Sequence, residues 1–473
     1  MVEQEHTTHT QEGHVIIVPS PGMGHLIPLT EFAKLLHSTH NFSISLLLLT
    51  TTSVPTSAQS AYLSGLPSAI SYTFLPPVDP SLLPDDVAHE VTINLTHVHS
   101  ANHLRDSIAR LTRDTRVVAL VTDLFGTLLF DVAREFGVLP YLYFTSTAMC
   151  LSLLFHLPLL DETVSCEYRD MVDPVVLPGC VPLYGKDFVD TAKDRKDEAY
   201  KVIMDQIKRY KLAEGIFVNT FMDLEPGALH ALQHNNPDQP PVYPIGPIIQ
   251  SGLGDGPDGS DILRWLDRQQ PESVLFVSFG SGGTLSYEQL IELAIGLEKS
   301  GQRFLWVVRS PSNSSFGSFF SAKSQDDPFG FLPDGYVDRI ADRGLLVPSW
   351  APQIEVLGHR STGGFLSHCG WNSTLESIVN GVPLIAWPLY AEQRMNAVML
   401  NEGVKVALRP KGAEGNLVEA EEIAKVVREL MEGEEGKRVH QRMKELSEYA
   451  KMSRSEDGVS TKLLNQVVHK WQS

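Results

Sequence analysis

The segment SHCGWNSTLES, from Ser367 to Ser377, joins a histidine, a glycine, a tryptophan and several small polar residues in one short run. The residues that lead into it, GGFLS (363–367), form an apolar run that predicts a buried strand. The residues that follow its centre, LESIVNG (375–381), predict a short helix that ends at a glycine. The segment is therefore expected to be a strand-to-helix turn that gathers hydrogen-bond donors at the start of the helix.

The first turn of this predicted helix is a candidate anion site. Gly370 allows a close backbone approach, and residues 371–373 enter a helix whose first N–H groups have no partner inside it. Because a helix N-terminus carries partial positive charge, a phosphate or diphosphate can bind here beside His368, although the segment lacks Lys and Arg. The alternative is structural: Ser373 and Glu376 match the S-x-x-E capping box, which only closes a helix end.

Apolar runs typical of strands alternate with amphipathic, helix-like segments in both halves of the chain. Each run is nearly continuous, as expected for strands that helices cover on both faces. This alternation predicts an α/β fold with two doubly wound parallel sheets facing a cleft, in which ligands lie beyond the carboxyl ends of the strands. The strand candidates are HVIIVPS (14–20), FSISLLLL (42–49), VVALVTDL (117–124), YLYFTS (141–146), GIFVNTF (215–221), SVLFVSFG (273–280), RFLWVVR (303–309), GGFLSHC (363–369), PLIAWP (383–388) and KVAL (405–408).

A polar segment separates the two halves. Residues 249–261 are rich in Gly, Pro, Asp and Ser, which is the composition of a linker. We therefore expect an N-terminal domain over residues 1–248, a C-terminal domain over residues 262–457, and a C-terminal helix over residues 458–473 that packs back on the N-terminal domain.

Charge, cysteines and hydropathy limit the partners and the location. The formal net charge is -19 and no Lys/Arg block is present, which excludes a basic nucleic-acid-binding face and disfavours an anionic membrane surface. The four cysteines form no C-x-x-C pair, which argues against a zinc site and fits the reduced cytoplasm. The polar residues 1–13 lack the apolar core of a signal peptide, and the apolar run 141–160 contains hydroxyl groups and a proline. We therefore expect a cytoplasmic protein with no membrane span. The sequence carries no signal for the oligomeric state, and a monomer is the default expectation.

Two titratable residues follow strand candidates of the first half. His25 lies in PSPGMGHLIP (19–28), and Asp123 ends the run at 117–124. Parallel neighbouring strands place their carboxyl ends at one edge of a sheet, so the two side chains can meet. A carboxylate that accepts from one imidazole nitrogen fixes the tautomer and lets the ring act as a general base near neutral pH. The alternative for His25 is helix entry or a structural hydrogen bond.

No metal is expected. The sequence has no Asp-x-Asp pair, a common device for holding a metal ion on a diphosphate. His97, His99 and His103 form a weak candidate cluster, because His99 and His103 share a helical face that His97 does not.

The segment WAPQIEVLGHRSTGGFLSHCGWNSTLESIVNGVPLIAWPLYAEQ, residues 350–393, closely resembles the signature of plant UDP-dependent glycosyltransferases that act on small molecules. PSPGMGHLIP (19–28) and SFGSGG (278–283) also look like features of this family, and the resemblance extends over essentially the whole chain. It is nearest to the hydroquinone glucosyltransferase (arbutin synthase) type, whose relatives act on other simple phenols and on indoxyl. It implies two Rossmann-like domains of the GT-B architecture, with the acceptor in the N-terminal domain and the UDP-sugar in the C-terminal one.

The resemblance implies a role for each matching position of the donor site. Gln393 at the end of the signature resembles the glucose-using members, whereas a histidine there is associated with galactose, so UDP-glucose is the expected co-substrate, with no cofactor. The implied contacts are with uracil at Trp350 and Ala351, with the nucleoside at Gln353, with the ribose at Glu376, with phosphate at Ser281, His368, Asn372 and Ser373 beside Trp371, and with the sugar at Glu392 and Gln393, with Trp387 nearby.

The resemblance also implies the reaction. The His25–Asp123 dyad deprotonates the hydroxyl group of a small aromatic acceptor, such as hydroquinone or indoxyl, which attacks the anomeric carbon with inversion and gives a β-glucoside. Other phenols and aromatic amines stay open as acceptors. The candidate acceptor-binding residues, for each of which plain core packing or solvation is the alternative, are Ser20, Glu90, Phe125, Met149, Leu153 and Tyr390.

Two rival functions compete with this interpretation. A nicotinamide-dependent oxidoreductase is suggested by Gly22-Met23-Gly24 after a strand, but Ile27 occupies the place of the third glycine and no acidic residue ends the second strand. A sugar-nucleotide-binding protein without catalysis is the second rival, and the presence of both His25 and Asp123 argues against it.

Overall fold

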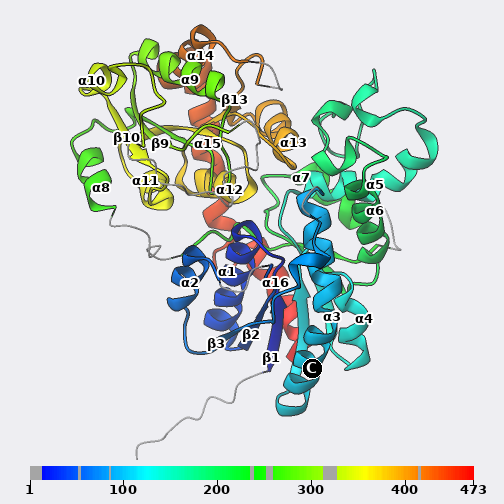
Figure 1. Ribbon diagram of the computed structural model, residues 1–473. Coiled ribbons are helices and arrows are strands. Elements are labelled where there is room, and N and C mark those ends of the chain that lie inside the picture. The colour runs from blue at the N-terminus through cyan, green and yellow to red at the C-terminus, as the bar shows by residue number, and fades with distance from the viewer. Residues whose placement is uncertain are drawn as a thin grey trace, which may run out of the picture.

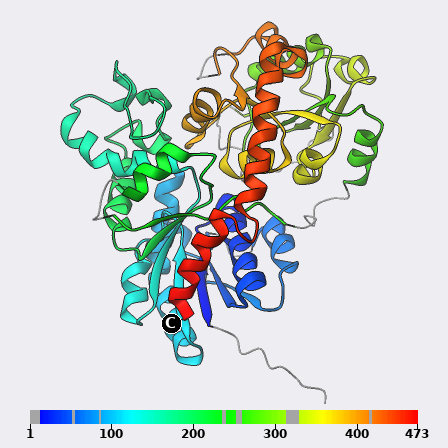
Figure 2. The same ribbon diagram turned by 180° about the vertical axis from the view of Figure 1, so that it is seen from behind.

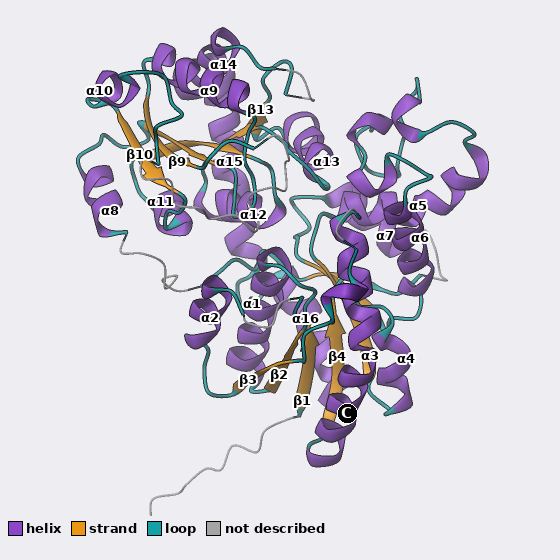
Figure 3. Ribbon diagram, viewed as in Figure 1, coloured by secondary structure: helices purple, strands orange, loops and turns teal. Residues whose placement is uncertain are grey.

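The computed structural model describes residues 13–51, 55–84, 87–234, 239–251, 259–312, 328–413 and 417–472. In this part of the chain two parallel β-sheets, each flanked by helices, form two lobes (Figure 1; Figure 3). We call them the N-lobe, built on strands β1–β7, and the C-lobe, built on strands β8–β13. The expected α/β fold with two Rossmann-like, doubly wound parallel sheets is confirmed.

The N-lobe sheet has seven strands in the order β3-β2-β1-β4-β5-β6-β7. Its strands are β1 (His14–Val18), β2 (Ser43–Leu48), β3 (Ile70–Phe74), β4 (Val117–Thr122), β5 (Leu139–Phe144), β6 (Gly215–Val218) and β7 (Val242–Pro244). The helices that precede or follow them are α1 (Met23–His40), α2 (Ser57–Ser64), α3 (His89–Asp114), α4 (Leu129–Glu135), α5 (Ala148–Thr163), α6 (Glu198–Tyr210) and α7 (Pro226–His234).

The C-lobe sheet has six strands in the order β10-β9-β8-β11-β12-β13. Its strands are β8 (Val274–Ser278), β9 (Arg303–Val308), β10 (Gly344–Pro348), β11 (Thr362–Ser367), β12 (Leu384–Ala386) and β13 (Ala407–Leu408). The helices of this half are α8 (Ser260–Asp267), α9 (Tyr287–Ser300), α10 (Tyr336–Ile340), α11 (Gln353–Gly358), α12 (Trp371–Asn380), α13 (Gln393–Val398), α14 (Ala420–Glu432) and α15 (Glu434–Ser453), and α16 (Val459–Gln472) ends the described chain.

The central strands are apolar throughout because helices cover both of their faces. In β1, Val15 and Ile17 belong to the cluster that includes α1, whereas Ile16 and Val18 belong to the opposite cluster with α3 and α4. Successive strand residues point to opposite faces, so a two-sided core needs an unbroken apolar run. This is the pattern on which the sequence-based strand assignment rested.

Three strands were missed by that assignment: β3, β7 and β10. Each lies at an edge of its sheet, where one side has no neighbouring strand. Most residues of β3 and β10 are partly or fully exposed, so neither strand carries the continuous apolar run of a central strand. The signal that identifies a buried strand is therefore absent in β3 and β10. β7 is buried, but it has only three residues, which is too short a run to stand out in the sequence.

The strand order reverses once in each sheet. The reversal lies between β1 and β4 in the N-lobe and between β8 and β11 in the C-lobe. Crossover connections leave a crevice at such a switch point, beyond the carboxyl ends of the two strands. The residues that follow these four strands are thereby placed to form a site.

The C-terminal helices connect the lobes. Seen from behind, α15 and α16 run as one orange-to-red stretch from the C-lobe onto the N-lobe (Figure 2). Leu464, Val467 and Trp471 of α16 are buried in the N-lobe core, and α16 packs against β4 and β7. The expected linker at 249–261 falls partly outside the described residues, since 252–258 are not among them. No helix in the described ranges is long and apolar enough to cross a membrane.

Candidate active site between the two lobes

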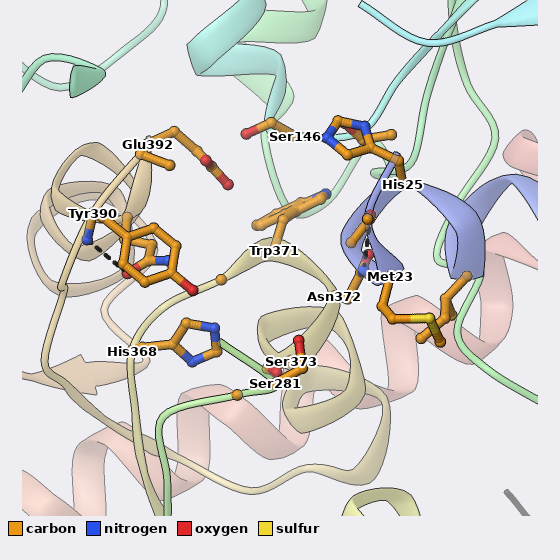
Figure 4. A pocket seen from close by; sticks show the side chains of 18 of the residues that line it. Met23, His25, Ser146, Ser281, His368, Trp371, Asn372, Ser373, Tyr390 and Glu392 are labelled. Carbon is orange, nitrogen blue, oxygen red and sulfur yellow. Dashed lines mark hydrogen bonds between the residues drawn. The ribbon is translucent and has the colours of Figure 1, made fainter. Parts of the chain in front are cut away.

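A cavity of about 800 Å³ lies between the lobes, where the two switch points meet. Residues that follow β1 and β4 line one wall, and residues that follow β8 and β11 line the other. Figure 4 shows His25 and Ser146 across the cavity from Tyr390 and Glu392, with His368, Ser281 and Ser373 together at one end.

The N-lobe wall contains an imidazole backed by a carboxylate. His25 Nδ1 lies 3.0 Å from Asp123 Oδ2, and the exposed fractions of the two side chains are 19% and 0%. Asp123 Oδ1 accepts from Ser20 Oγ at 2.6 Å, and Asp123 Oδ2 accepts from the Ser20 amide at 2.7 Å. The buried carboxylate is thus held in one orientation, and the structure brings the two predicted residues of the dyad together.

The charges around His25 favour proton uptake. Burial lowers the pKa of His25, but the negative charge of Asp123, with weaker contributions from Glu392 and Glu90, raises it, and the net pKa lies above the ordinary histidine value. Burial raises the pKa of Asp123, and the positive charge of His25 together with hydrogen bonds lowers it to about 2. Asp123 therefore stays ionised and stabilises the imidazolium form of His25.

His97 belongs to this network. Its Nε2 lies 2.8 Å from Ser20 Oγ. Because the hydroxyl proton of Ser20 is donated to Asp123, Nε2 of His97 must carry the proton in this bond. Burial lowers the pKa of His97 to about 4, so the ring is neutral. His99 and His103 are exposed, so the three histidines do not converge, and no group of three or more metal-ligating side chains occurs within the described ranges.

The C-lobe wall contains the start of α12, as the segment from Ser367 to Ser377 predicted. Gly370 is the N-cap residue, and no side chain caps the helix. Ser373 and Glu376 do not form the capping box that was the structural alternative, because the helix begins two residues before Ser373 and both side chains accept from Gln353 Nε2, at 2.9 Å and 2.6 Å. The helix N-terminus therefore faces the cavity with its first amides available to a ligand.

A second histidine stands at this wall. His368 follows β11 directly, and its ring fills the space that side chains at Gly280 and Gly370 would need: a Cβ at Gly280 would lie 2.6 Å from Nε2 of the ring. Burial, together with the smaller effect of the positive charge of Arg309, lowers the pKa of His368 to about 4. The neutral ring is a hydrogen-bond donor and acceptor, not a cation.

Arg309 is the single Lys or Arg among the described residues that line the cavity. Its guanidinium donates to the carbonyl oxygens of Ser281 and Ser349, which ties two loops of the C-lobe together at the cavity. Ser281 lines the same end of the cavity as His368 (Figure 4).

The residues that the sequence assigned to the nucleoside all line the cavity. Trp350 and Ala351 follow β10 and line the cavity, with Gln353 and Glu376 beside them. Burial raises the pKa of Glu376 to about 7, and the hydrogen bond from the neutral amide of Gln353 only partly opposes this shift. A buried carboxyl group with one amide partner retains the capacity to accept from a ligand hydroxyl group.

The sugar positions expected from the sequence are only partly on the wall. Glu392 and Gln393 line the cavity at the start of α13. Trp387 does not: it is 3% exposed, directly continues β12, and packs edge-to-face on Phe279 with ring centroids 6.3 Å apart. Its side chain packs in the C-lobe core, just behind the strand end from which the loop to Glu392 and Gln393 starts.

The two lobes are in contact at the cavity. The indole N–H of Trp371 donates to the Asn219 carbonyl oxygen at 2.8 Å, and Asn372 Nδ2 donates to the Gly24 carbonyl oxygen at 3.4 Å. Trp371 lines the cavity, but its N–H group is already used between the lobes.

Three of the predicted acceptor residues line the cavity and three do not. Glu90, Phe125 and Tyr390 are on the wall, and the Phe125 ring meets His25 edge-on with centroids 5.8 Å apart. Ser20 is buried against Asp123 instead. On α5, the cavity is lined by Cys150 and Leu154 in place of the predicted Met149 and Leu153, which are buried in the core. Since successive helix residues point about 100° apart, an error of one position moves a side chain from the wall to the core.

Several cavity residues were not expected from the sequence. They carry no local motif, because loops and helices far apart in the chain bring them together. They include Met23, Tyr62, His89, Ile93, Ser146 and Asp190.

The chain is similar in sequence and structure to enzymes of a single family. Residues 255–448 match the family model described as UDP-glucoronosyl and UDP-glucosyl transferase. The chain is 56% identical over 470 residues to a hydroquinone glucosyltransferase of Rauvolfia serpentina, which covers 99% of this chain and 99% of that protein. Phytolacca americana UGT2, solved in complex with UDP-2fluoro-glucose and pterostilbene, matches with a TM-score of 0.91 at 67% identity over 98% of this chain and 100% of that one. A Polygonum tinctorium UDP-glucosyltransferase capable of glucosylating indoxyl, in complex with 3,4-dichloroaniline, matches with a TM-score of 0.90 at 52% identity over 98% and 99% of the two chains.

Proposed function

The chain is a glycosyltransferase that belongs to the family of UDP-glucuronosyl and UDP-glucosyl transferases, and from this premise we propose that it transfers glucose from UDP-glucose to the hydroxyl group of a small aromatic acceptor, with inversion. One observation carries the proposal. The Asp123-backed imidazole of His25 and the uncapped N-terminus of α12 line opposite walls of one cavity.

His25 acts as the general base. The acceptor hydroxyl group gives its proton to Nε2, the ring nitrogen opposite the Asp123 contact, as its oxygen attacks the anomeric carbon. Asp123 keeps the proton on Nδ1 and stabilises the imidazolium that forms. The C–O bond to the phosphate breaks on the opposite face, so an α-linked donor gives a β-glucoside without a covalent sugar intermediate.

The C-lobe wall stabilises the departing UDP. Its charge is received by the N-terminus of α12, by the neutral His368, and by the side chains of Ser281, Asn372 and Ser373, all of which line the cavity. Fixed donors of this kind need no rearrangement when the charge develops.

The uridine and the sugar are assigned to the remaining wall. Trp350 stacks on uracil, whose edge bonds the Ala351 backbone, with Gln353 beside the nucleoside, and Glu376 accepts from the ribose hydroxyls. Glu392 and Gln393 hold the sugar. The support for these roles is that all of these residues line the cavity on the C-lobe side.

An aromatic acceptor suits the N-lobe side of the cavity. Phe125, Phe144 and Leu154 supply apolar surface beside His25, with Glu90 and Tyr390 as polar groups that can meet hydroxyls. The relatives named above are a hydroquinone glucosyltransferase and enzymes solved with pterostilbene or 3,4-dichloroaniline. Hydroquinone, indoxyl and similar phenols are therefore the acceptors to test first.

The experiment is a mass-spectrometric screen with UDP-glucose and UDP-galactose against hydroquinone, indoxyl, other phenols and aromatic amines. We expect hexosyl products of phenols with UDP-glucose, with NMR of the product showing the β-configuration. Thermal shift separates the rivals: a ligand at one hundred times its Kd stabilises by about 2.7 kcal/mol. Stabilisation by UDP with no product across the panel would support a binding protein, and stabilisation by NADH alone would support an oxidoreductase.

A further inference from the structure

The loop that carries the proposed sugar contacts, residues 389–394, is fastened from the other lobe. Asp190 of the N-lobe lies in the long connection between α5 and α6, and Ala391 lies between Tyr390 and Glu392. The Asp190 amide donates to the Ala391 carbonyl oxygen at 3.1 Å, and Asp190 Oδ2 accepts from the Ala391 amide at 2.7 Å. One acidic residue thus satisfies both backbone groups of Ala391.

The same carboxylate is held by two cations. Asp190 Oδ1 accepts from Arg394 Nη1 at 2.8 Å and from Lys193 Nζ at 2.7 Å. Arg394 also donates to the Leu389 carbonyl oxygen, so it joins the two ends of the loop. Asp190 is one-third exposed and lines the cavity itself, so these bonds lie at the site.

The backbone of the loop needs such a partner. Ala391 has a φ of 54°, a left-handed conformation that non-glycine residues adopt rarely and at an energetic cost. Inside the loop, Gln393 Oε1 accepts from the amides of Leu389 and Tyr390, at 2.9 Å and 3.1 Å. Gln393 fixes the loop from within, and Asp190 fixes it from the opposite lobe.

From this geometry we propose that Asp190 is a positioning residue for the glucosyl group: it holds residues 389–394 so that Glu392 and Gln393 meet the sugar only when the two lobes are docked. The inference rests on the proposed function. Asp190 does not touch the proposed uracil, ribose or phosphate positions, so its effect is confined to the part of the donor that UDP lacks.

The test compares UDP-glucose with UDP. In Asp190→Ala, we expect the affinity for UDP-glucose, measured by calorimetry, to fall at least tenfold while the Kd of UDP stays within twofold. The kcat/KM for UDP-glucose falls by the same factor or more. Asp190→Asn retains an oxygen for the Ala391 amide but loses the charge, so it should recover part of the loss.

Asp187→Asn is the matched control. Asp187 lies in the same segment and also reaches across the lobes, but its carboxylate pairs with Arg409, at 3.4 Å, and not with Ala391 or Arg394. Melting temperatures of all variants report on folding. The decisive quantity is the ratio of the affinity for UDP-glucose to the affinity for UDP. The proposal is overturned if Asp190→Ala weakens both ligands equally or leaves this ratio unchanged. It is also overturned if Asp187→Asn and Asp190→Asn change the ratio equally.

Failure of the proposed function is recognised separately. The proposed function fails if the wild-type protein transfers glucose to none of the phenols in the panel. The ratio of UDP-glucose to UDP affinity still measures the role of Asp190 in that case, because it requires binding and no turnover.

Discussion

The two switch points of the molecule are built alike but carry opposite chemistry. In each, a buried parallel strand leads to a helix whose N-cap residue is a glycine, and a histidine lines the cavity: His25 in the first turn of α1 and His368 directly after β11. In the N-lobe the imidazole lies 3.0 Å from a buried carboxylate, and its pKa is raised. In the C-lobe the imidazole is buried and lies near Arg309, and burial together with the positive charge of Arg309 lowers its pKa to about 4.

The difference shows that the burial and the nearby charges, not the strand-to-helix turn itself, determine whether the histidine at such a turn can take up a proton. A ring beside Asp123 can take up a proton, which suits a general base. A ring beside an arginine and a helix N-terminus stays neutral, which suits a hydrogen bond to an anion without adding a proton to it. In the function proposed above, this strand-to-helix arrangement provides the general base in one lobe and the diphosphate site in the other.

Among the variants considered, His25→Ala should have the largest effect, because it removes the proposed general base of the N-lobe. We expect kcat to fall about 10³-fold or more, since general-base catalysis contributes about 10²–10⁴-fold. The Kd of UDP should stay within twofold, because His25 lies on the opposite wall. Steady-state kinetics and calorimetry measure the two quantities, and a kcat within a factor of ten of wild type would remove His25 as the base.

Asp123→Asn should lower kcat/KM by about 10²-fold and shift its pH dependence. The wild-type acid limb reports the raised pKa of His25, below which the base is protonated. Loss of the Asp123 charge lowers that pKa, so the acid limb should move to lower pH, although Glu392 and Glu90 still face the ring. An acid limb that stays in place or moves to higher pH would contradict this account.

His368→Ala tests the C-lobe half of the comparison. A hydrogen bond to a charged group contributes about 1.5–3 kcal/mol, so we expect the Kd of UDP to rise roughly 10–100-fold. The acid limb of kcat/KM should stay where it is, because His368 does not titrate near neutral pH. The comparison fails if this variant moves the acid limb and leaves the Kd of UDP unchanged.

Glu376→Gln should have the smallest effect. Since burial raises the pKa of Glu376 to about 7, the carboxyl group is protonated below that pH and ionised above it. Wild-type affinity for UDP-glucose, whose phosphates keep their charge in this range, should therefore rise a few-fold from pH 6 to pH 8. The variant should show a flat profile in the same calorimetric series, and an identical rise in both proteins would exclude Glu376 as the titrating group.

The sequence predicted those features that depend on residues close together in the chain. Continuous apolar runs identified the central strands, since a strand covered on both faces must be apolar throughout. His25, Asp123, Ser281 and His368 follow such strands within a few residues, so the parallel arrangement alone placed them at one edge of each sheet. The donor-rich start of α12 was likewise readable, because unpaired amides are a property of any helix N-terminus.

Only the tertiary structure decided which side chains reach the cavity. It moved the α5 contacts from Met149 and Leu153 to Cys150 and Leu154, buried Trp387 in the core, and brought Asp190 to Ala391 across the lobes. The physical reason is that the apolar run of a central strand and the unpaired amides of a helix end are recorded in residues close together in the chain. Which side of a helix faces the cavity, and how the two lobes dock, depend on packing between segments far apart in the chain.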